Sequence, residues 1–273
     1  MKFFTKLFGK KVSDNDVLKT GQIPDFLKEF ESDLQKYKLE YIEIHTVSLK
    51  ENETLGFKQS KFLGKPYLPV GMDYPKDKSG KPLILWAQLN FSEIPHLEGY
   101  PERGILQFFV SSNDWYGMNE YKVLYHENTE EEMRTDFSFL TKDLYEDCPI
   151  GCEYKLNFTK ETECASDSDF RFDYTYKRET SYDFWKSLTE EQRTEKANWD
   201  NQGRHKIGGY CTFTQGDPRS FGSKRENDIS LLQIDSDFDK IMFGDCGVAH
   251  FFINKEELKN KSFEKVWFYW DCC

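Results

Sequence analysis

The sequence predicts an α+β fold made of two similar antiparallel β-rich repeats that pack together, with peripheral helices and an acidic insertion. Three observations lead to this class. Aromatic residues make up 16% of the chain, and such residues favour strands over an all-helical bundle. Several short segments alternate polar and apolar residues, as half-buried strands do. Short similarities also recur within the chain, in the same order and at a nearly constant spacing.

The length and composition limit the class of protein further. A chain of 273 residues with 24 phenylalanines and 15 tyrosines can bury a sizeable core, although 31% of its residues are charged. No stretch approaches the roughly 20 apolar residues of a membrane-spanning helix, and MKFFTKLFGKK lacks the features of a signal peptide. Seven widely spaced cysteines do not resemble a secreted disulfide framework, so we expect free thiols and a cytoplasmic protein.

The N-terminal part of the chain contains a short tail, a helix and the first repeat. Residues 1–20 form a cationic and polar segment, and residues 21–126 form the first folded region. Apolar residues at helical spacing, with Pro24 in the first turn, predict an amphipathic helix over 24–38. Alternation predicts a strand over 41–49. The apolar runs LILWAQLNF (83–91), GILQFFV (104–110) and YKVLYHE (121–127) predict three more.

The middle of the chain, residues 127–200, is predicted to be an acidic, partly helical insertion. It holds 20 Asp and Glu against 10 Lys and Arg, and so carries −10 of the net charge of −11. CEYKLNF (152–158) and FRFDYTYKRE (170–179) alternate like exposed strands. Residues 182–198 read as helix, and the capping-box spacing of Thr189 and Gln192 divides it into two. A solvated surface explains the charge better than a dock for a basic partner, and the charge argues against nucleic-acid binding.

The C-terminal region, residues 201–273, is predicted to hold the second repeat. Apolar runs near 229–235 and 247–253 predict two strands. Asn254, with Glu257 three residues later, predicts the start of a short helix at 255–260. An aromatic strand then leads to the final WDCC. We expect the two repeats and the insertion to form one compact unit.

Internal similarity is the most informative feature of the sequence. LGKPYLP around Gly64 and GGYCTFT around Gly209 align at an offset of 145 residues, and so do the strand segments around Gln88 and Gln233. GILQFFV at 104 and GVAHFFI at 247 differ by 143. Three ordered matches at nearly one offset indicate a duplicated β unit that buries its sheet face against its copy.

These segments resemble a known family. SKFLGKPYLPVGMDYP (60–75), LILWAQLNF, PERGILQFFV (101–110), HKIGGYCTFTQGDPR (205–219), LLQIDSD (231–237), GDCGVAHFFI (244–253) and WDCC are similar to the YwqG-like proteins, a bacterial domain family of unknown function. The resemblance implies an intracellular α+β fold with an internal duplication, and supplies no catalytic residues. Leu63 stands where that family usually has glycine, and Cys211 replaces its proline; these changes leave the geometry of both turns open and do not affect the resemblance.

The densest polar cluster is HKIGGYCTFTQGDPR. His205 could exchange protons near neutral pH, Asp217 could orient it, and Arg219 could clamp a carboxylate or phosphate. A purely structural role is the stronger interpretation, because Asp217-Pro218-Arg219 makes a turn. Gln215 lies in the same segment. The paired glycines lack the spacing of a phosphate-binding loop.

Four polar residues occupy matching positions on predicted strands. Gln88 matches Gln233, and Gln107 matches His250. They could line a groove between the repeats, where ligand sites often lie. Hydrogen bonds to backbone that tie the two repeats together are the favoured alternative.

No metal, cofactor or nucleophile motif is recognisable. Cys148 with Cys152 and Cys246 with His250 are pairs four residues apart, but they lie far from each other and no C-x-x-C is present. The run Asp235 to Asp239 lacks the glycine and final glutamate of a calcium loop. We therefore predict no metal and no cofactor.

Two functional classes remain open. The preferred class is a binding or protein-interaction module that holds a protein or small ligand on its acidic face or between the repeats. The other is an enzyme with a site near His205, Asp217 and Arg219. The basic, aromatic N-terminus could touch an anionic membrane weakly, although a frayed terminus explains it better. The sequence does not indicate an oligomeric state.

Overall fold

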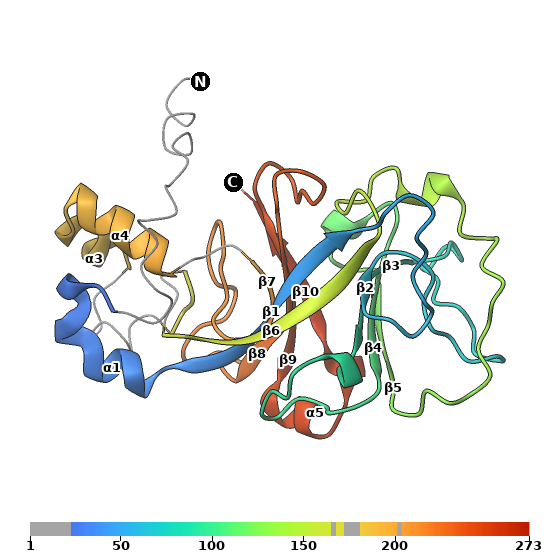
Figure 1. Ribbon diagram of the computed structural model, residues 1–273, viewed down its shortest axis with the longest axis horizontal. Helices are drawn as coiled ribbons and strands as arrows, with labels where there is room; N and C mark the ends of the chain where they lie inside the picture. Colours follow the sequence, from blue (N-terminus) through green and yellow to red (C-terminus); the bar gives the residue numbers. More distant parts are fainter. Residues whose placement is uncertain (1–22, 165–167, 172–180, 201–203, 273) are drawn as a thin grey trace.

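The fold is mostly β, in a computed structural model that describes residues 23–164, 168–171, 181–200 and 204–272. In this part of the chain ten strands form one antiparallel sheet, in the order β10-β9-β8-β7-β1-β6-β2-β3-β4-β5. The sheet curls until it resembles a nearly closed barrel, and the helices are few and short (Figure 1). The α+β prediction therefore overestimated the share of helix.

The strands and helices have the following bounds. The strands are β1 (Leu39–Ser48), β2 (Lys61–Phe62), β3 (Ile84–Asn90), β4 (Ile105–Val110), β5 (Tyr121–His126), β6 (Tyr154–Glu163), β7 (His205–Gly208), β8 (Asp228–Asp235), β9 (Val248–Asn254) and β10 (Trp267–Asp271). The α-helices are α1 (Glu31–Lys36), α3 (Ser181–Ser187), α4 (Glu190–Asp200) and α5 (Lys255–Lys259). Short 3-10 helices are η2 (Asp25–Phe30), η3 (Phe91–Glu93), η4 (Trp115–Gly117), η5 (Lys142–Tyr145) and η6 (Phe263–Lys265).

A long antiparallel ribbon of β1 and β6 forms the middle of the sheet. The two strands pair continuously from Leu39 opposite Glu163 to Ser48 opposite Tyr154. β2 pairs with the outer edge of β6, and β7 pairs with the outer edge of β1. The ribbon thus joins two four-stranded units, which we call the first unit (β2–β5) and the second unit (β7–β10). β6 belongs to the acidic segment 127–200, so that segment supplies a central strand.

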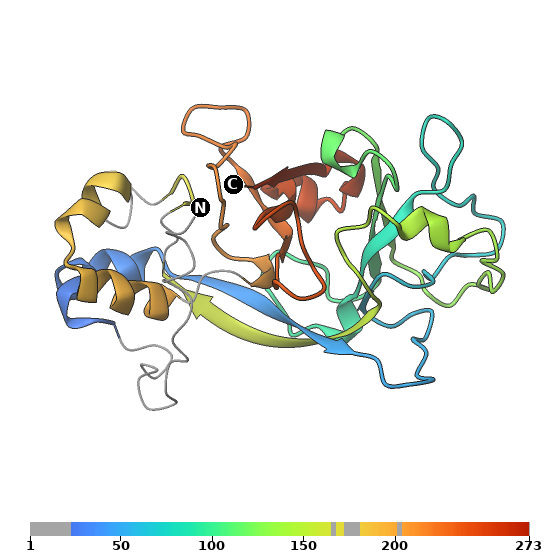
Figure 2. The same ribbon diagram turned by 90° about the horizontal axis from the view of Figure 1, so that it is seen from above.

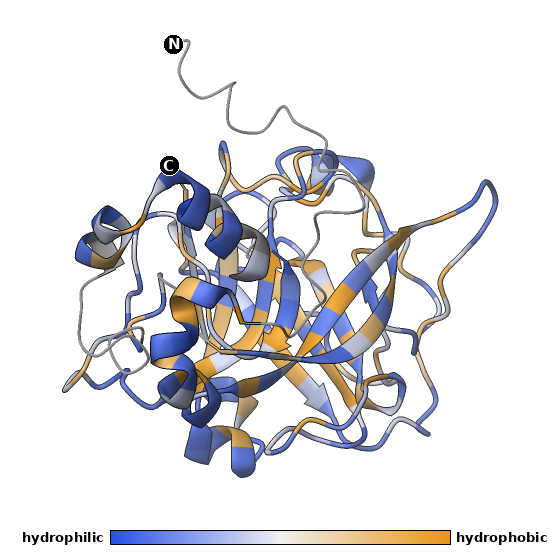
Figure 3. Ribbon diagram, turned by 60° about the vertical axis from the view of Figure 1, so that its left-hand side comes forward, coloured by the Kyte–Doolittle hydropathy of each residue, from blue (hydrophilic) through white to orange (hydrophobic). Residues whose placement is uncertain are grey.

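The main core lies where the two units face each other across the curled sheet. Phe108 of β4 packs against Phe251 of β9, with ring centroids 4.6 Å apart. Near the outer edges, the Tyr121 hydroxyl donates to the Val266 carbonyl at 3.2 Å. Apolar residues concentrate on the strands, whereas the helices are largely hydrophilic (Figure 3). Each unit therefore covers a sheet face that the other would leave in water.

A helical lobe sits at one end of the β1–β6 ribbon, away from the first unit (Figures 1 and 2). It has a small core of its own, made of Leu27, Phe30, Leu34, Phe184 and Leu188. The predicted capping box divides its second helical stretch: Thr189 N–H donates to the Gln192 side chain at 2.9 Å, and Gln192 N–H donates back to the Thr189 hydroxyl at 3.2 Å. These reciprocal bonds satisfy two donors at the start of α4.

Most predicted elements are confirmed within one or two residues. The predicted helix over 24–38 is a 3-10 turn followed by α1, and Asn254 caps α5 by accepting the Glu256 N–H at 3.1 Å. The short strands β2 and β7 were not predicted. Residues 1–20, and most of the expected strand at 170–179, lie outside the described residues. No described helix has the length and apolar character needed to cross a membrane.

Equivalent hydrogen bonds occur in the two units, between residues separated by the offset of 145 found in the sequence. Gln88 in β3 accepts from the Tyr67 N–H at 2.9 Å and donates to the Gln59 carbonyl at 2.8 Å. Gln233, the matching residue in β8, makes the same two bonds. Its partners are the Thr212 N–H at 3.0 Å and the Arg204 carbonyl at 2.9 Å. Each glutamine thereby fastens the chain on both sides of a turn to the middle of a buried strand.

The turns that follow β2 and β7 also have similar backbone conformations. Gly208 and Gly209 have φ values of 76° and 71°, in the left-handed region that glycine adopts without strain. In the first unit, Gly64 has a φ of 82° and Leu63 has a φ of 56°. Leucine in this region is strained, yet the turn keeps the same sign of φ as its counterpart.

The first prediction concerns these two glutamines. Gln88→Met and Gln233→Met keep the side-chain volume but leave a buried N–H and at least one carbonyl without a partner. We expect each to lower the free energy of unfolding by about 2–4 kcal/mol. Exposed Gln35→Met on α1 is the control and should change it by less than about 0.5 kcal/mol. Chemical denaturation measures all three, and a small loss for either buried glutamine would contradict the assignment.

Candidate functional site

His205, the first predicted site residue, is buried at the start of β7. Its Nδ1 accepts the backbone N–H of Asp235 at 3.0 Å, and its ring meets the edge of Phe62 at 5.4 Å. Burial lowers the pKa of His205 to about 4, against a smaller opposing effect of Asp237. The ring is therefore neutral near pH 7 and acts as a hydrogen-bond acceptor. No described contact joins it to Asp217 or Arg219.

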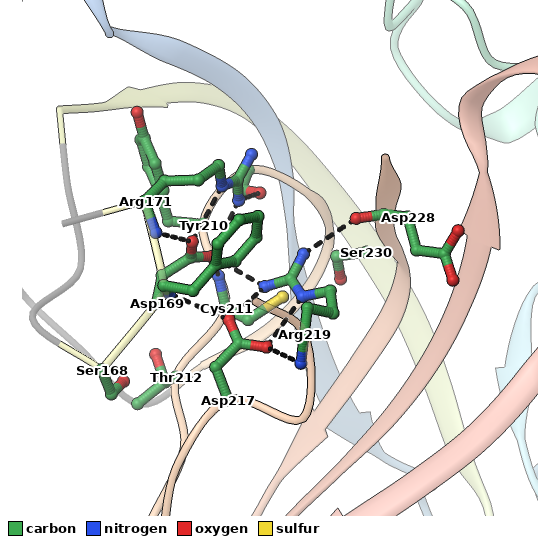
Figure 4. Close-up of polar contacts among 12 residues, drawn as sticks. Ser168, Asp169, Arg171, Tyr210, Cys211, Thr212, Asp217, Arg219, Asp228 and Ser230 are labelled. Atoms are coloured by element: carbon green, nitrogen blue, oxygen red, sulfur yellow. Dashed lines mark hydrogen bonds and ion pairs between the residues drawn. The ribbon is translucent and has the colours of Figure 1, made fainter. Parts of the chain in front are cut away.

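Asp217 and Arg219 lie together in a buried ion-pair network (Figure 4). The Arg219 guanidinium donates to Asp217 through Nε at 2.9 Å and Nη2 at 2.7 Å. Nη2 also donates to Asp169 at 2.9 Å, and Nη1 donates to the Asp228 carbonyl at 3.0 Å. The Arg219 side chain is fully buried. Its donors are occupied by the protein, so it has little capacity left to clamp a ligand.

Asp169 is the centre of this network. It accepts two hydrogen bonds from the Arg171 side chain, at 2.8 and 2.7 Å, and one from the Cys211 N–H at 2.9 Å. Burial by itself would raise the pKa of Asp169, but the Arg171 and Arg219 guanidiniums outweigh it and hold the pKa far below its usual range. Asp169 is therefore ionised at every moderate pH. Asp169 was not identified from the sequence because it lies far from Arg219 along the chain.

The network occupies the place of an aromatic cluster in the first unit. Arg219 and Tyr74 are separated by the same offset as the two glutamines, and so are the carbonyls they bind, of Asp228 and Leu83. The Tyr74 hydroxyl donates to Leu83 at 3.0 Å, as the Arg219 guanidinium donates to Asp228. Tyr74 stands among rings, with Phe139 at 4.9 Å. The matching positions indicate that Arg219 supports the fold, as Tyr74 does.

The strand residues proposed as groove-lining also bond within their own units. Gln107 donates to the Tyr67 carbonyl at 2.6 Å and to Gln88 at 2.8 Å. His250 is fully buried between the rings of Phe213 and Phe252, at 4.6 and 5.3 Å. Burial lowers the pKa of His250 well below its usual range. These contacts belong to packing inside each unit.

Gln215 is placed differently from the other candidates. It is exposed, and its side chain donates to the Cys272 carbonyl. Its N–H, with that of Thr214, donates to Asp271. Gln215 thus ties the turn of the second unit to the end of β10.

A cavity of about 350 Å³ lies beside the turn of the first unit. Its walls come from the turn after β2, from the segment around η5 and from the approach to β6. The lining residues are Leu63, Gly64, Lys65, Phe137, Leu140, Lys142, Tyr145, Ile150, Gly151, Cys152 and Glu153. The wall is largely apolar, with two lysines and one glutamate. Sequence reasoning missed it because three separate segments contribute and none contains a recognisable motif.

Lys61 is buried and is hydrogen-bonded to Lys65, a residue of the cavity wall. Its ammonium donates to the carbonyls of Gly56 at 2.5 Å and Lys65 at 2.9 Å. Burial lowers the pKa of Lys61 to about 8, with Glu153 and Glu93 opposing the shift. The ammonium thus has carbonyl partners but no hydrogen-bonded carboxylate among the described residues.

One cysteine differs from the expectation of free thiols. Cys246 is disulfide-bonded, so that expectation is wrong at this residue. Five other cysteines are not in a disulfide: Cys148, Cys152, Cys164, Cys211 and Cys272. Within the described ranges, no three His, Cys, Asp or Glu side chains gather as a metal site.

Asp235 is a buried carboxyl at the end of β8. It occupies the position that Asn90 holds in the first unit, and it accepts the Ser236 N–H at 2.8 Å. Burial raises the pKa of Asp235 from 3.8 to about 7, partly offset by the Ser236 N–H and Lys206. Because the folded state holds this proton more tightly than the unfolded state, its contribution to stability is lost as the pH rises from about 4 through 7.

The second prediction uses Arg219→Met, which leaves Asp169 and Asp217 buried with less counter-charge. We expect a loss of about 3–5 kcal/mol in the free energy of unfolding. Arg103→Met is the control, because Arg103 is exposed and pairs with exposed Glu127, and it should cost less than about 1 kcal/mol. Denaturant titrations compare the two variants. If Arg219→Met lowered the free energy of unfolding no more than Arg103→Met, a structural role of Arg219 would be contradicted.

The third prediction uses Asp235→Asn, which keeps an acceptor for the Ser236 N–H and removes the titration. The variant should gain about 1–3 kcal/mol over the parent protein at pH 8, and less at pH 5. The difference between the two pH values isolates Asp235, since other groups titrate in both proteins. Exposed Asp245→Asn is the control. A gain that does not grow with pH would contradict the raised pKa.

Comparison with known proteins adds a family but no activity. No curated protein is similar to the chain at a significant level. A family model described as a domain of unknown function (DUF1963) matches residues 60–272, which include both four-stranded units and β6. The chain therefore belongs to the DUF1963 family.

Proposed function

We propose that this protein is a binding module that holds a small molecule in the cavity beside the turn of the first unit. The observation that carries the proposal is the cavity itself, with about 350 Å³ of space, apolar walls and a few polar groups. Such a combination is typical of small-molecule sites. Ligand binding is supported more strongly here than at the other predicted positions, where the side chains are hydrogen-bonded to the protein or, in the case of His250, fully buried between rings.

The cavity also lies close to the junction of the two units. Gly151, on its wall, donates its N–H to the Lys240 carbonyl of the second unit's loop at 2.6 Å. Ile150 forms a bridge with Ile241. A ligand in the cavity would therefore contact a segment that holds the units together, which supports the idea of a site near their interface.

The alternative of an enzyme using His205, Asp217 and Arg219 has less support. His205 is neutral and already accepts a hydrogen bond, and Arg219 is enclosed by two carboxylates. A general base and an anion clamp need free lone pairs or donors that reach a substrate. We keep the binding module as the proposed function.

We further propose that the two units arose by duplication of one unit, within a YwqG-like protein. The shared glutamine bonds, the left-handed turns and the β-bulges between Leu85 and Ala87 and between Ser230 and Leu232 support this. A cytoplasmic location belongs to the same proposal, and cell fractionation tests it.

The fourth prediction tests binding in the cavity. Leu140→Trp places a larger side chain in the cavity wall, and Leu124→Trp is the matched control. Both leucines are half-buried beside the same apolar cluster, but only Leu140 lines the cavity. A fragment library screened by thermal shift should give ligands that raise the melting temperature of the parent protein and of Leu124→Trp, but not of Leu140→Trp. Equal responses in all three, or no ligand at all, would refute the proposed site.

A further inference from the structure

A carboxylate of the protein fills the turn of the second unit. Glu163, the last residue of β6, accepts the Lys206 ammonium at 2.9 and 3.0 Å and the Tyr210 N–H at 2.6 Å. It lies directly against Gly209, where a Cβ would collide with it. The left-handed turn, the buried lysine and the backbone N–H together form a carboxylate-binding arrangement.

The first unit repeats this arrangement with Glu153 against Gly64, but without the hydrogen bonds that Glu163 accepts. Lys61 and Lys65 occupy the positions that Lys206 and Tyr210 hold in the second unit, and the turn at Gly64 has the same left-handed sign. Within the described residues, the Lys65 N–H donates no hydrogen bond, and the Lys61 ammonium meets only carbonyl oxygens. Glu153 lies against Gly64, but neither the Lys61 ammonium nor the Lys65 N–H donates a described hydrogen bond to it. The donors that hold Glu163 in the second unit therefore have no hydrogen-bonded carboxylate in the described part of the first unit.

The cavity lies beside the Gly64 turn of the first unit. Gly64 and Lys65 form part of its wall, and Lys142 adds a second cationic side chain, against the single negative charge of Glu153. Leu63, Leu140 and Ile150 contribute apolar surface. The charge balance favours an anion, and the apolar walls favour a ligand whose remaining atoms are hydrocarbon.

We propose that the cavity binds a small organic carboxylate with an apolar or aromatic body. Its carboxylate would accept the Lys65 N–H, as Glu163 accepts the Tyr210 N–H, and its body would lie against Leu140 and Ile150. A space of about 350 Å³ corresponds to roughly 12 water molecules at about 30 Å³ each, and so to a ligand of about ten non-hydrogen atoms. This inference rests on the proposed function, because it names the ligand class of the same cavity.

Phenylacetate is the probe, and phenylacetamide is its neutral match. In ¹H–¹⁵N correlation spectra of the full chain, phenylacetate should shift the Lys65 backbone amide in a saturable manner, and bind at least about ten-fold more tightly than the amide. Inorganic phosphate carries charge but no apolar body, and should bind more weakly than phenylacetate. Equal binding of acid and amide, or tighter binding of phosphate, would overturn the carboxylate assignment while leaving the cavity as a binding site. If no probe or fragment binds, the proposed function itself fails.

Charge variants give an independent test. Lys142→Gln should weaken phenylacetate binding about 3- to 10-fold, because it removes one cation from the cavity. Lys122→Gln, an exposed lysine on β5, is the matched control and should have no effect. Glu153→Gln should strengthen binding, since it removes the one negative charge of the wall. Weaker binding of phenylacetate to Glu153→Gln, or an unchanged affinity for it in Lys142→Gln, would contradict the proposed preference of the cavity for an anion.

Discussion

The ladder between β1 and β6 is the constraint on which the rest of the structure depends. It fixes both units, because β2 pairs with β6 and β7 pairs with β1. It also brings two glutamates to the turns: Glu163 at the end of β6 reaches the second unit, and Glu153, just before β6, stands beside the first. One strand thus supplies the acid that closes one turn and the acid that borders the cavity at the other.

The two units show how one backbone arrangement tolerates different chemistry. The glutamines at the middle of β3 and β8 satisfy equivalent backbone groups, which keeps the turns in place whatever surrounds them. Tyr74 of the first unit packs among aromatic rings. At the matching position of the second unit, Arg219 forms ion pairs with Asp169 and Asp217. An isolated buried guanidinium would be costly, so this exchange requires both carboxylates. Asp169 comes from outside the second unit, and the substitution is therefore supported by the rest of the chain.

Local patterns in the sequence were sufficient for most elements but not for the site. Alternation and apolar runs located β1, β3, β4, β5, β8 and β9, since those strands are long enough to show a period. β2 and β7 are short and carry buried Lys61 and Lys206, whose charge hides them from a hydrophobic pattern. The fixed offset did identify the paired glutamines, because their roles depend on local register. The ion partner Asp169 and the cavity depend on tertiary proximity between distant segments, which no local period encodes.

The asymmetry between the buried lysines explains why a ligand would favour the first unit. Lys206 is neutralised by Glu163, so its turn is already complete. Lys61 has carbonyl partners, and Glu153 and Glu93 act on it without a hydrogen bond; burial still lowers its pKa to about 8, so part of its desolvation cost remains uncompensated. An anion brought to Lys65 would lie next to the carbonyl that Lys61 binds and would favour the charged ammonium. Binding would then raise the pKa of Lys61, and by linkage the anion should be held more tightly where that lysine is protonated, below about pH 8, than above it.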